Sequence, residues 1–474
     1  MVRRGARVFR GLRYASPPVG EGRWAHPADP RALGAGGVPL AGCHSGTLDA
    51  SRFGPVCPQP GDGGPVAADE TQSEDCLFLN VYAPAAPVAA PAAGEAPLLP
   101  VVVFLHGGGN VRGAGSRYDM SAVAARGFVA VTLNHRLGAL GFLASDALAG
   151  AREGANLGLR DIAAALAWVR RNARGFGGDA TRVTLAGHGS GGTNALALTT
   201  SPIAVLDGAP LFARVLSMSP PPRFGQLRRE AAKADAVFSA DAGCAGRGDG
   251  ESACLRALSV SEVLAASPLR VAPWWDGAAA GPADERELPT TGGRRAGLLV
   301  VDGDVLTAES WIAMGQSDRP ARVPLMLTAM AAEPDARPAR GARVHTAADY
   351  AAAVRARLGP LGSFWSAAAG DVALADAALA AYPAGKYSSP QEALDAMVTD
   401  VRLTCGLKRL AGMAAASAPE PVFLGVNFMK LSEPVAVLGA SSDGVAPATA
   451  TNLARAAAPG HASSLAFHGL DVFP

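Results

Sequence analysis

A short strand leads directly into a glycine-rich turn and then into an apolar helix within residues 183–198. Val183–Leu185 is β-branched and apolar, Gly187–Gly192 contains four glycines, and Thr193–Leu198 begins a helical pattern. A chain that passes from strand to helix through so tight a turn needs glycine, because glycine adopts positive φ angles without steric cost. The segment therefore predicts a strand–turn–helix unit of the kind found in α/β folds.

The turn also fits, with one exception, the G-x-S-x-G pattern of a hydrolase nucleophile elbow. Its middle position is Gly189 instead of serine. Backbone strain at such a tip costs a residue with a side chain roughly 1–3 kcal/mol, and glycine relieves the strain while removing the hydroxyl. A frame moved by one residue would make Ser190 the nucleophile, but it would invert every side chain of the preceding strand. We expect Gly189 at the tip, with Ser190 as the alternative nucleophile.

A second glycine-rich turn follows another buried-strand pattern, Pro100–Leu105. It reads His106-Gly107-Gly108-Gly109-Asn110. In hydrolases, an HGGG loop presents backbone N–H groups to the oxyanion of the transition state. We expect Gly108 and Gly109, together with the backbone of Ser190, to form a site resembling an oxyanion hole. An ordinary turn is the alternative for either motif alone, but their order along the chain favours the hydrolase interpretation.

Longer blocks carry a family resemblance. The chain resembles the type B carboxylesterase/cholinesterase family of α/β-hydrolases over nearly its whole length. This resemblance implies one α/β domain with a large, mainly parallel central sheet flanked by helices on both faces. Besides the HGGG turn, the matching blocks are Phe9–Trp24, Ser73–Pro84, Val131–Ser145 and Gly154–Gly187.

The resemblance also assigns the other two positions of a catalytic triad. The acid is Glu333, within Val323–Ala336, although Pro334 stands where the family usually has glycine; a solvated loop carboxylate is the alternative. The base is His468, within Ala466–Phe473. Glu333 and His468 are thus kept while the nucleophile position is Gly189. Loss of a triad nucleophile costs on the order of 10⁶ in kcat, which predicts a vestigial, inactive triad.

Three further blocks are similar to the non-catalytic adhesion branch of the family, and in particular to neurotactin: Leu40–Gln59, Gly297–Leu306 and Met397–Leu407. The resemblance implies that the chain is not an enzyme. It implies instead an extracellular domain of a type II membrane protein, which binds a cell-surface or secreted protein and forms a homo-oligomer. The alternatives are a carboxylic-ester hydrolase that uses Ser190 and a pseudoenzyme that binds a small ligand without turnover.

The spacing of the cysteines indicates whether the protein is found in an oxidising compartment, where disulfide bonds form. Cys57 and Cys76 flank a polar segment, and Cys244 and Cys254 flank a glycine-rich one. Both spacings resemble two disulfide loops of the family; the alternative is that all six cysteines are reduced thiols. Cys43 and Cys405 have no assigned partner. The family also implies two structural salt bridges, Arg23–Glu74 and Arg136–Asp161.

Composition limits the remaining function classes. A net charge of +1 with 49% hydrophobic residues is typical of a globular protein and argues against a basic nucleic-acid binder. We expect a single domain over residues 1–474, truncated at both ends, with a low-complexity surface loop at Ala83–Pro97. No apolar run reaches the ~20 residues of a membrane-spanning helix, and the residues predict neither a metal site nor a cofactor.

Periodicity and apolar runs also predict individual helices and strands along the chain. Hydrophobic periodicity predicts a helix over Leu159–Arg174, with Ile162, Leu166 and Val169 on its buried face. Buried strands are predicted at Pro100–Leu105, Phe128–Leu133, Val183–Leu185, Val215–Met218, Val323–Leu327 and Pro421–Val426.

Overall fold

The computed structural model describes eleven segments of the chain. They are residues 2–28, 46–60, 71–85, 97–148, 154–221, 225–267, 299–331, 344–358, 374–427, 435–436 and 462–463. Cys43, Glu333, Pro334, His468 and most of the loop 83–97 lie outside them.

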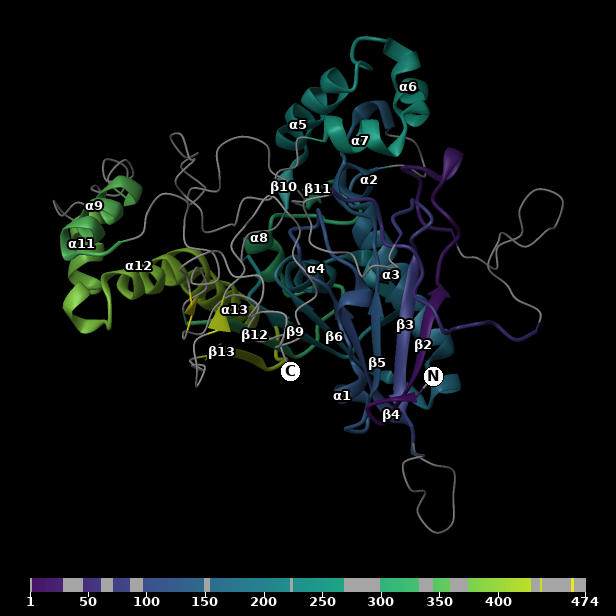
Figure 1. Ribbon diagram of the computed structural model, residues 1–474, viewed down its shortest axis with the longest axis horizontal. Coiled ribbons are helices and arrows are strands. Elements are labelled where there is room, and N and C mark those ends of the chain that lie inside the picture. The colour runs from purple at the N-terminus through teal and green to yellow at the C-terminus, as the bar shows by residue number, and fades with distance from the viewer. Residues whose placement is uncertain are drawn as a thin grey trace.

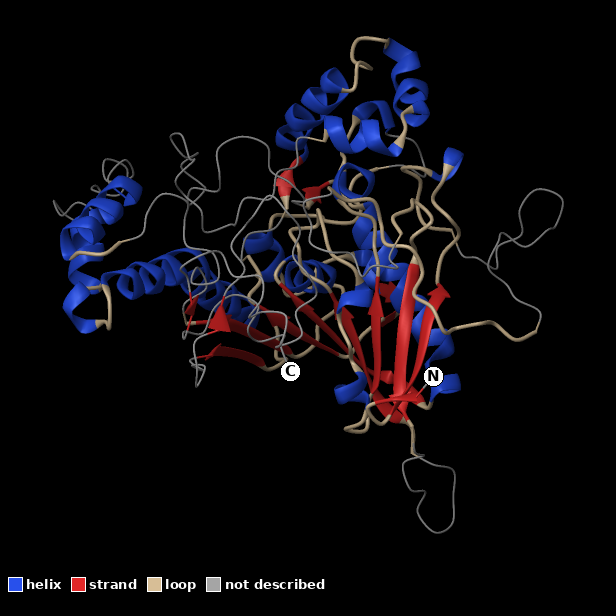
Figure 2. Ribbon diagram, viewed as in Figure 1, coloured by secondary structure: helices blue, strands red, loops and turns tan. Residues whose placement is uncertain are grey.

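A nine-stranded sheet runs through the centre of the molecule (Figures 1 and 2). From β3 to β1 the neighbouring strands are antiparallel, and β3 also runs antiparallel to β5. From β5 to β13 every neighbouring pair is parallel. In spatial order the strands are β1 (Val2–Arg3), β2 (Ala6–Arg13), β3 (Phe78–Pro84), β5 (Val129–Leu133), β4 (Leu99–Leu105), β6 (Gly178–His188), β9 (Arg214–Met218), β12 (Leu325–Met330) and β13 (Val422–Asn427).

Helices lie in the connections between the parallel strands, as is usual in α/β folds. The helix α3 runs from Leu157 to Asn172, so it begins two residues before the predicted segment and ends two residues before Arg174, and its Ile162, Leu166 and Val169 side chains are buried as predicted. Helices α5, α6 and α7 gather at one end of the sheet, at the top of Figure 1. The helices are α1 (Ser121–Ala124), α2 (Gly138–Phe142), α3 (Leu157–Asn172), α4 (Ser190–Thr199), α5 (Arg228–Asp241), α6 (Glu251–Ala257), α7 (Val260–Ala266), α8 (Ser310–Met314), α9 (Ala347–Leu358), α11 (Leu374–Ala381), α12 (Pro390–Thr399) and α13 (Cys405–Ser417).

Among the described residues, three short strand pairs lie outside the main sheet. Two of them are β7 (Val205–Leu206) with β8 (Ala209–Pro210) and β10 (Gln226–Leu227) with β11 (Val300–Val301); the third is β14 (Val435–Ala436) with β15 (Ala462–Ser463). The predicted α/β class is confirmed, because the central sheet is large and mainly parallel and helices pack on it.

Apolar side chains from the central strands and from α3 and α4 form the main core. Residues such as Val103, Leu185 and Leu196 are fully or almost fully buried in it. Each predicted strand overlaps an observed one and starts within two residues of it, except that β6 begins five residues before Val183; β6 and β12 also end three residues later than predicted. Residues 178–182 at the start of β6 are mostly polar or small and are partly exposed. They contain no apolar run from which a strand could be predicted.

Candidate active site

The strand β6 enters α4 through a single residue, Gly189. Its φ of 55° and ψ of −121° are allowed to glycine but strained for any residue with a side chain. The Gly189 N–H donates to the Met218 carbonyl of β9 at 2.9 Å, and its carbonyl accepts from the Thr193 N–H of α4 at 3.0 Å. These two bonds fix the elbow at the carboxyl end of the parallel strands, with Gly189 at its tip.

Glycines on both sides of the tip let α4 approach the strands closely. A Cβ atom added to Gly187 would lie 2.3 Å from the Gly191 carbonyl oxygen, and one added to Gly191 would lie 2.3 Å from the Leu105 carbonyl oxygen. No real side chain fits at such distances. The first turn of α4 therefore rests directly on the end of β4, from which the HGGG turn begins.

The oxyanion loop, which we define as residues 106–113, follows β4. Three consecutive residues in it have positive φ angles, namely Gly108 at 121°, Gly109 at 67° and Asn110 at 59°. The Val111 and Arg112 N–H groups donate to the Gly108 carbonyl. These backbone angles explain the two glycines and turn the loop back toward α4.

Asn110 joins the oxyanion loop to α4. Its backbone N–H donates to Ser190 Oγ at 3.1 Å. Its side-chain amide and that of Asn194 exchange two hydrogen bonds, of 3.0 and 2.8 Å, and both side chains are buried. The Gly138 N–H of α2 donates to the Asn110 carbonyl at 2.8 Å. Through Asn110, the oxyanion loop is thus hydrogen-bonded to both α4 and α2.

The structure places three of the predicted site residues, Gly108, Gly109 and Ser190, around this junction. Ser190 is the first residue of α4, is half-buried, and directs its hydroxyl toward the oxyanion loop. The helix N-terminus favours negative charge at that position. The predicted acid and base, Glu333 and His468, lie outside the described residues; β12 ends at Met330, just before the segment that carries Glu333.

Two buried histidines pack together at the start of the oxyanion loop. The rings of His106 and His135 stack with centroids 4.7 Å apart and planes 4° from parallel. Burial, more than any other cause, lowers the pKa of His106 to about 3 and also lowers the pKa of His135. Both imidazoles are therefore neutral at physiological pH, and they support the loop as packed side chains.

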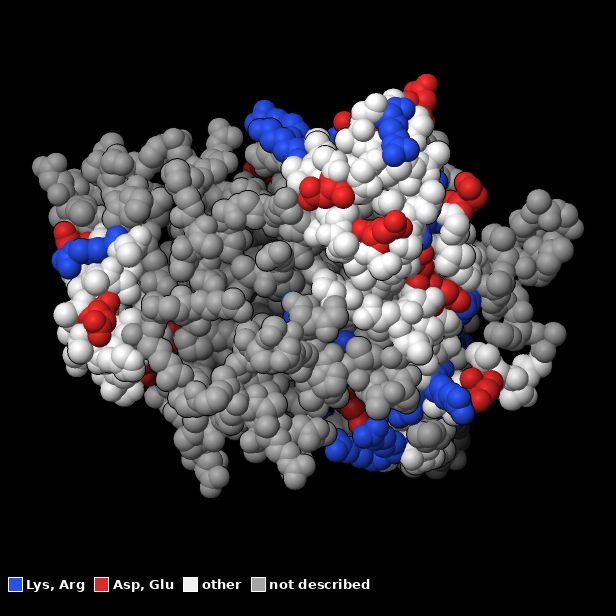
Figure 3. Space-filling view, turned by 45° about the horizontal axis from the view of Figure 1, so that its top comes forward, with Lys and Arg blue, Asp and Glu red and all other residues white. Residues whose placement is uncertain are grey.

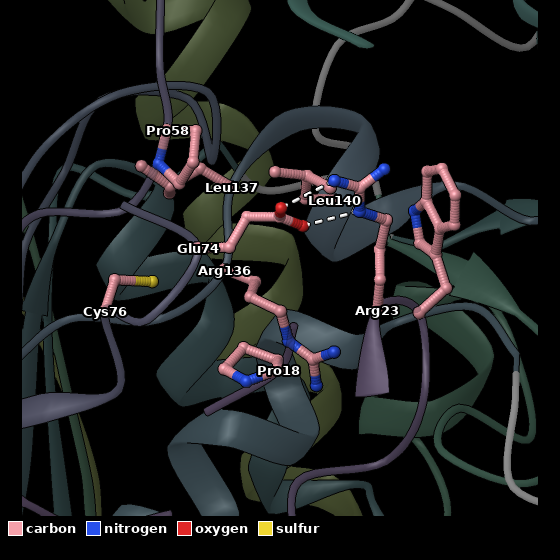
Figure 4. Close-up of a pocket in the computed structure, with 9 residues that line it drawn as sticks. Pro18, Arg23, Pro58, Glu74, Cys76, Arg136, Leu137 and Leu140 are labelled. Carbon is pink, nitrogen blue, oxygen red and sulfur yellow. Dashed lines mark hydrogen bonds and ion pairs between the residues drawn. The ribbon is translucent and has the colours of Figure 1, made fainter. Parts of the chain in front are cut away.

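Ion pairs hold the segments around the site together. Arg136 binds Asp161 through two side-chain hydrogen bonds of 2.9 and 2.7 Å, and both side chains are buried. Arg23 binds Glu74 at 2.6 Å. A small pocket is lined by Arg23, Glu74, Arg136 and neighbouring apolar residues, and the two members of the Arg23–Glu74 pair face each other in it (Figure 4). This pocket surrounds structural ion pairs, whereas the elbow contributes none of its lining.

Two disulfide bonds are present, Cys57–Cys76 and Cys244–Cys254, as the family resemblance implies. Cys405 has a free, exposed thiol. Gln59, near the first disulfide, accepts a hydrogen bond from the Gly113 N–H and donates one to the Gly113 carbonyl. The N-terminal disulfide loop is thereby tied to the oxyanion loop.

Within the described segments, no three His, Cys, Asp or Glu side chains converge on a position that could hold a metal ion. In the same segments, no helix has both the length and the apolar character needed to cross a membrane. Basic and acidic side chains both occur across the face shown in Figure 3.

Sequence reasoning missed the Asn110–Asn194 pair. The two residues lie far apart along the chain, and neither belongs to a motif of charged or catalytic residue types. Two asparagines following glycine-rich turns are the only signal, and that signal does not specify a partner.

The sequence profile of the carboxylesterase family matches residues 2–434. Among curated proteins, the chain is 38% identical to the para-nitrobenzyl esterase of Bacillus subtilis (strain 168) over 56% of this chain and 50% of that protein. It is 38% identical to the phenmedipham hydrolase of Pseudarthrobacter oxydans over 46% of this chain and 40% of that protein. Each aligned region therefore spans half or less of the curated relative.

Among solved structures, a para-nitrobenzyl esterase superposes with a TM-score of 0.68 at 27% identity, covering 100% of this chain and 81% of that one.

These comparisons overturn one expectation. The prediction that this chain is not an enzyme is wrong, because the relatives above are esterases and hydrolases by name and the solved para-nitrobenzyl esterase shares its fold.

Proposed function

Because this chain belongs to the carboxylesterase family, we propose that it hydrolyses carboxylic esters with the Ser190 hydroxyl as nucleophile. One observation carries the proposal: Ser190 Oγ lies between the N-terminus of α4 and the oxyanion loop, 3.1 Å from the Asn110 backbone nitrogen. A hydrogen-bond donor and a helix N-terminus both stabilise an alkoxide there. Esterase and hydrolase relatives support the same reaction class.

The reaction that we propose has two halves. In the first, Ser190 Oγ attacks the carbonyl carbon of the ester and gives its proton to a general base, while the carbonyl oxygen becomes an oxyanion. Backbone N–H groups of the oxyanion loop, with Gly108 and Gly109 as donors, stabilise that charge. The alcohol leaves with a proton, and in the second half water releases the acid from the acyl-serine. His468 and Glu333 remain the proposed base and acid.

Gly189 limits the rate of this reaction. Its position at the tip is the one at which family hydrolases expose their nucleophile, so the Ser190 hydroxyl starts one residue beyond the most favourable attack point. A misplacement of about 1 Å can cost 10²-fold in rate. We therefore propose a slower esterase than one with serine at the tip.

The decisive experiment compares hydrolysis of p-nitrophenyl butyrate by the wild type and by Ser190→Ala. Thr193→Ala, which removes a hydroxyl one turn later in α4, is the matched control, and heat-denatured protein gives the background. We expect Ser190→Ala to reduce the rate to background while Thr193→Ala keeps at least a third of it. An unchanged rate in Ser190→Ala would exclude Ser190 as the nucleophile.

We also propose that the domain works outside the reducing cytosol. The two disulfides support this location, since such bonds persist in oxidising compartments. Membrane attachment, a cell-surface protein ligand, a homo-oligomer and closeness to neurotactin stay predictions from sequence resemblance alone.

A further inference from the structure

We propose that Asp235 is a proton-dependent latch that holds helix α5 against the structural support of the oxyanion loop. The inference concerns how the site is held together, so it stands whether or not Ser190 is the nucleophile. Its basis is an acidic side chain in an apolar interface between two elements.

The Asp235 carboxyl group lies between α5 and the segment after α2. The residue is only 9% exposed, and its Oδ2 atom accepts a hydrogen bond of 3.0 Å from the Ala144 backbone N–H. Around this contact, Ala144, Ala155, Ala231 and Val300 form a small buried apolar cluster. An ionised carboxylate in such surroundings is costly, whereas the protonated acid is tolerated.

The segment that Asp235 contacts leads to the active site. Ala144 follows α2, and all five residues of that helix are buried. At the other end of α2, the Gly138 N–H donates to the Asn110 carbonyl, and the Asn110 N–H donates to Ser190 Oγ. The helix α2 thus lies between the latch and the oxyanion loop, so movement at Ala144 is transmitted over a single short rigid element.

Charged groups near Asp235 are few. Asp146 and Arg228 pair with each other at 2.7 Å on the surface nearby. The neighbouring β10 and β11 contain no titratable residue, the α7 carboxylate Glu262 caps its own helix at Ser259, and the α6 carboxylate Glu251 binds the Ser239 hydroxyl of α5. Described charged residues of α5 itself include Arg229, Lys233 and Asp241, all of them at least partly exposed. No cation is buried with Asp235 among these groups.

Burial is the main cause that raises the pKa of Asp235 to about 7, and Asp146 adds to it, while the Ala144 N–H and Arg228 oppose it. When α5 is released, the carboxyl returns toward its ordinary pKa of 3.8. Between these values, the attached state holds a proton that the released state has lost. Attachment is therefore strongest below pH 3.8, weakens as pH rises, and reaches its lowest value above about 7.

Hydrogen exchange of the full chain between pH 5 and 8, read by mass spectrometry, tests the latch. One proton per opening predicts that the opening constant of residues 228–241 rises about tenfold per pH unit up to pH 7, beyond the intrinsic base catalysis of exchange. In Asp235→Asn, whose amide oxygen still accepts from Ala144, this excess dependence should disappear. The exposed Asp249→Asn is the control and should behave as the wild type.

A second variant keeps the test independent of how well Asp235→Asn folds. Asp146→Asn removes the neighbouring negative charge, so the pH at which exchange of residues 228–241 levels off should move below that of the wild type. The oxyanion loop, residues 106–113, should show the same pH dependence as α5. The latch is disproved if Asp235→Asn keeps the wild-type dependence, if the Asp146→Asn curve does not move, or if α5 responds to pH without residues 106–113.

Discussion

At the tip of the elbow, backbone geometry and side-chain chemistry make opposite demands on one residue. The φ of 55° at Gly189 suits glycine, while the reaction of the family places a hydroxyl there. Any side chain at this position is strained by roughly 1–3 kcal/mol. Natural hydrolases accept that strain for rate, and this chain has relaxed it.

The variant Gly189→Ser should therefore gain activity and lose stability. We expect kcat for p-nitrophenyl butyrate to rise at least tenfold, because the hydroxyl moves to the tip, and the free energy of unfolding in urea to fall by roughly 1–3 kcal/mol. Gly175→Ser, at an exposed position of a 3₁₀ helix with no neighbour within 4 Å of an added Cβ, is the control for stability. A Gly189→Ser variant that folds but hydrolyses the ester no faster than the wild type would show that the acid and base are not aligned with the tip.

The Asn110–Asn194 pair makes a second prediction at the residue scale. Asn194→Leu removes both amide–amide hydrogen bonds and leaves the Asn110 amide buried without them, at a cost of about 1–3 kcal/mol. We expect kcat to fall while KM changes less, since the pair positions the oxyanion loop, which acts on the transition state. In contrast, Asn172→Leu at the half-buried last position of α3 should leave the kinetics unaltered. Equal losses in both variants would argue against a positioning role.

At the scale of elements, local patterns along the chain predicted most of what surrounds the site. Apolar strand runs followed by glycine turns located β4, β6 and their turns, because close backbone approach leaves glycine as the sole choice at Gly187 and Gly191. Periodicity located α3. The antiparallel β1 and β2 and the short helix α2 escaped residue-level prediction, since Val2–Arg3 is a two-residue strand and Gly138–Phe142 is too short to show a period.

Element packing also depends on the buried ion pair between the end of β5 and α3. Asp161→Asn leaves the Arg136 guanidinium buried without its carboxylate, so we expect a loss of about 3–5 kcal/mol in the free energy of unfolding. The exposed pair Arg355–Asp376 offers a matched control, because Asp376→Asn there should cost less than about 1 kcal/mol. Urea denaturation followed by circular dichroism measures both. Similar losses would mean that the Arg136–Asp161 site is well hydrated.

At the scale of the whole molecule, the disulfides link segments that the sheet alone does not hold. Cys57–Cys76 closes a loop whose Gln59 binds the oxyanion loop, and Cys244–Cys254 closes a loop between α5 and α6. Sequence spacing predicted both pairings through family resemblance, but the contact between Gln59 and Gly113 depends on tertiary structure and had no sequence signal.

Removing the first disulfide should affect both stability and the site. Cys57→Ser with Cys76→Ser is expected to lower the free energy of unfolding by about 2–4 kcal/mol and to increase hydrogen exchange in residues 106–113, which Gln59 contacts. The pair Cys244→Ser with Cys254→Ser should lower stability by a similar amount without that local increase. If residues 106–113 were equally protected from hydrogen exchange in both double variants, the proposed link between the Cys57–Cys76 loop and the oxyanion loop would be contradicted.

Hydrolysis of p-nitrophenyl butyrate by the purified wild type beside Ser190→Ala tests the central claim most directly. Our account predicts slow turnover above the heat-denatured background by the wild type, and none by Ser190→Ala. Background rates for both proteins, or equal turnover by both, would contradict the assignment of Ser190 as the nucleophile of a carboxylic-ester hydrolase.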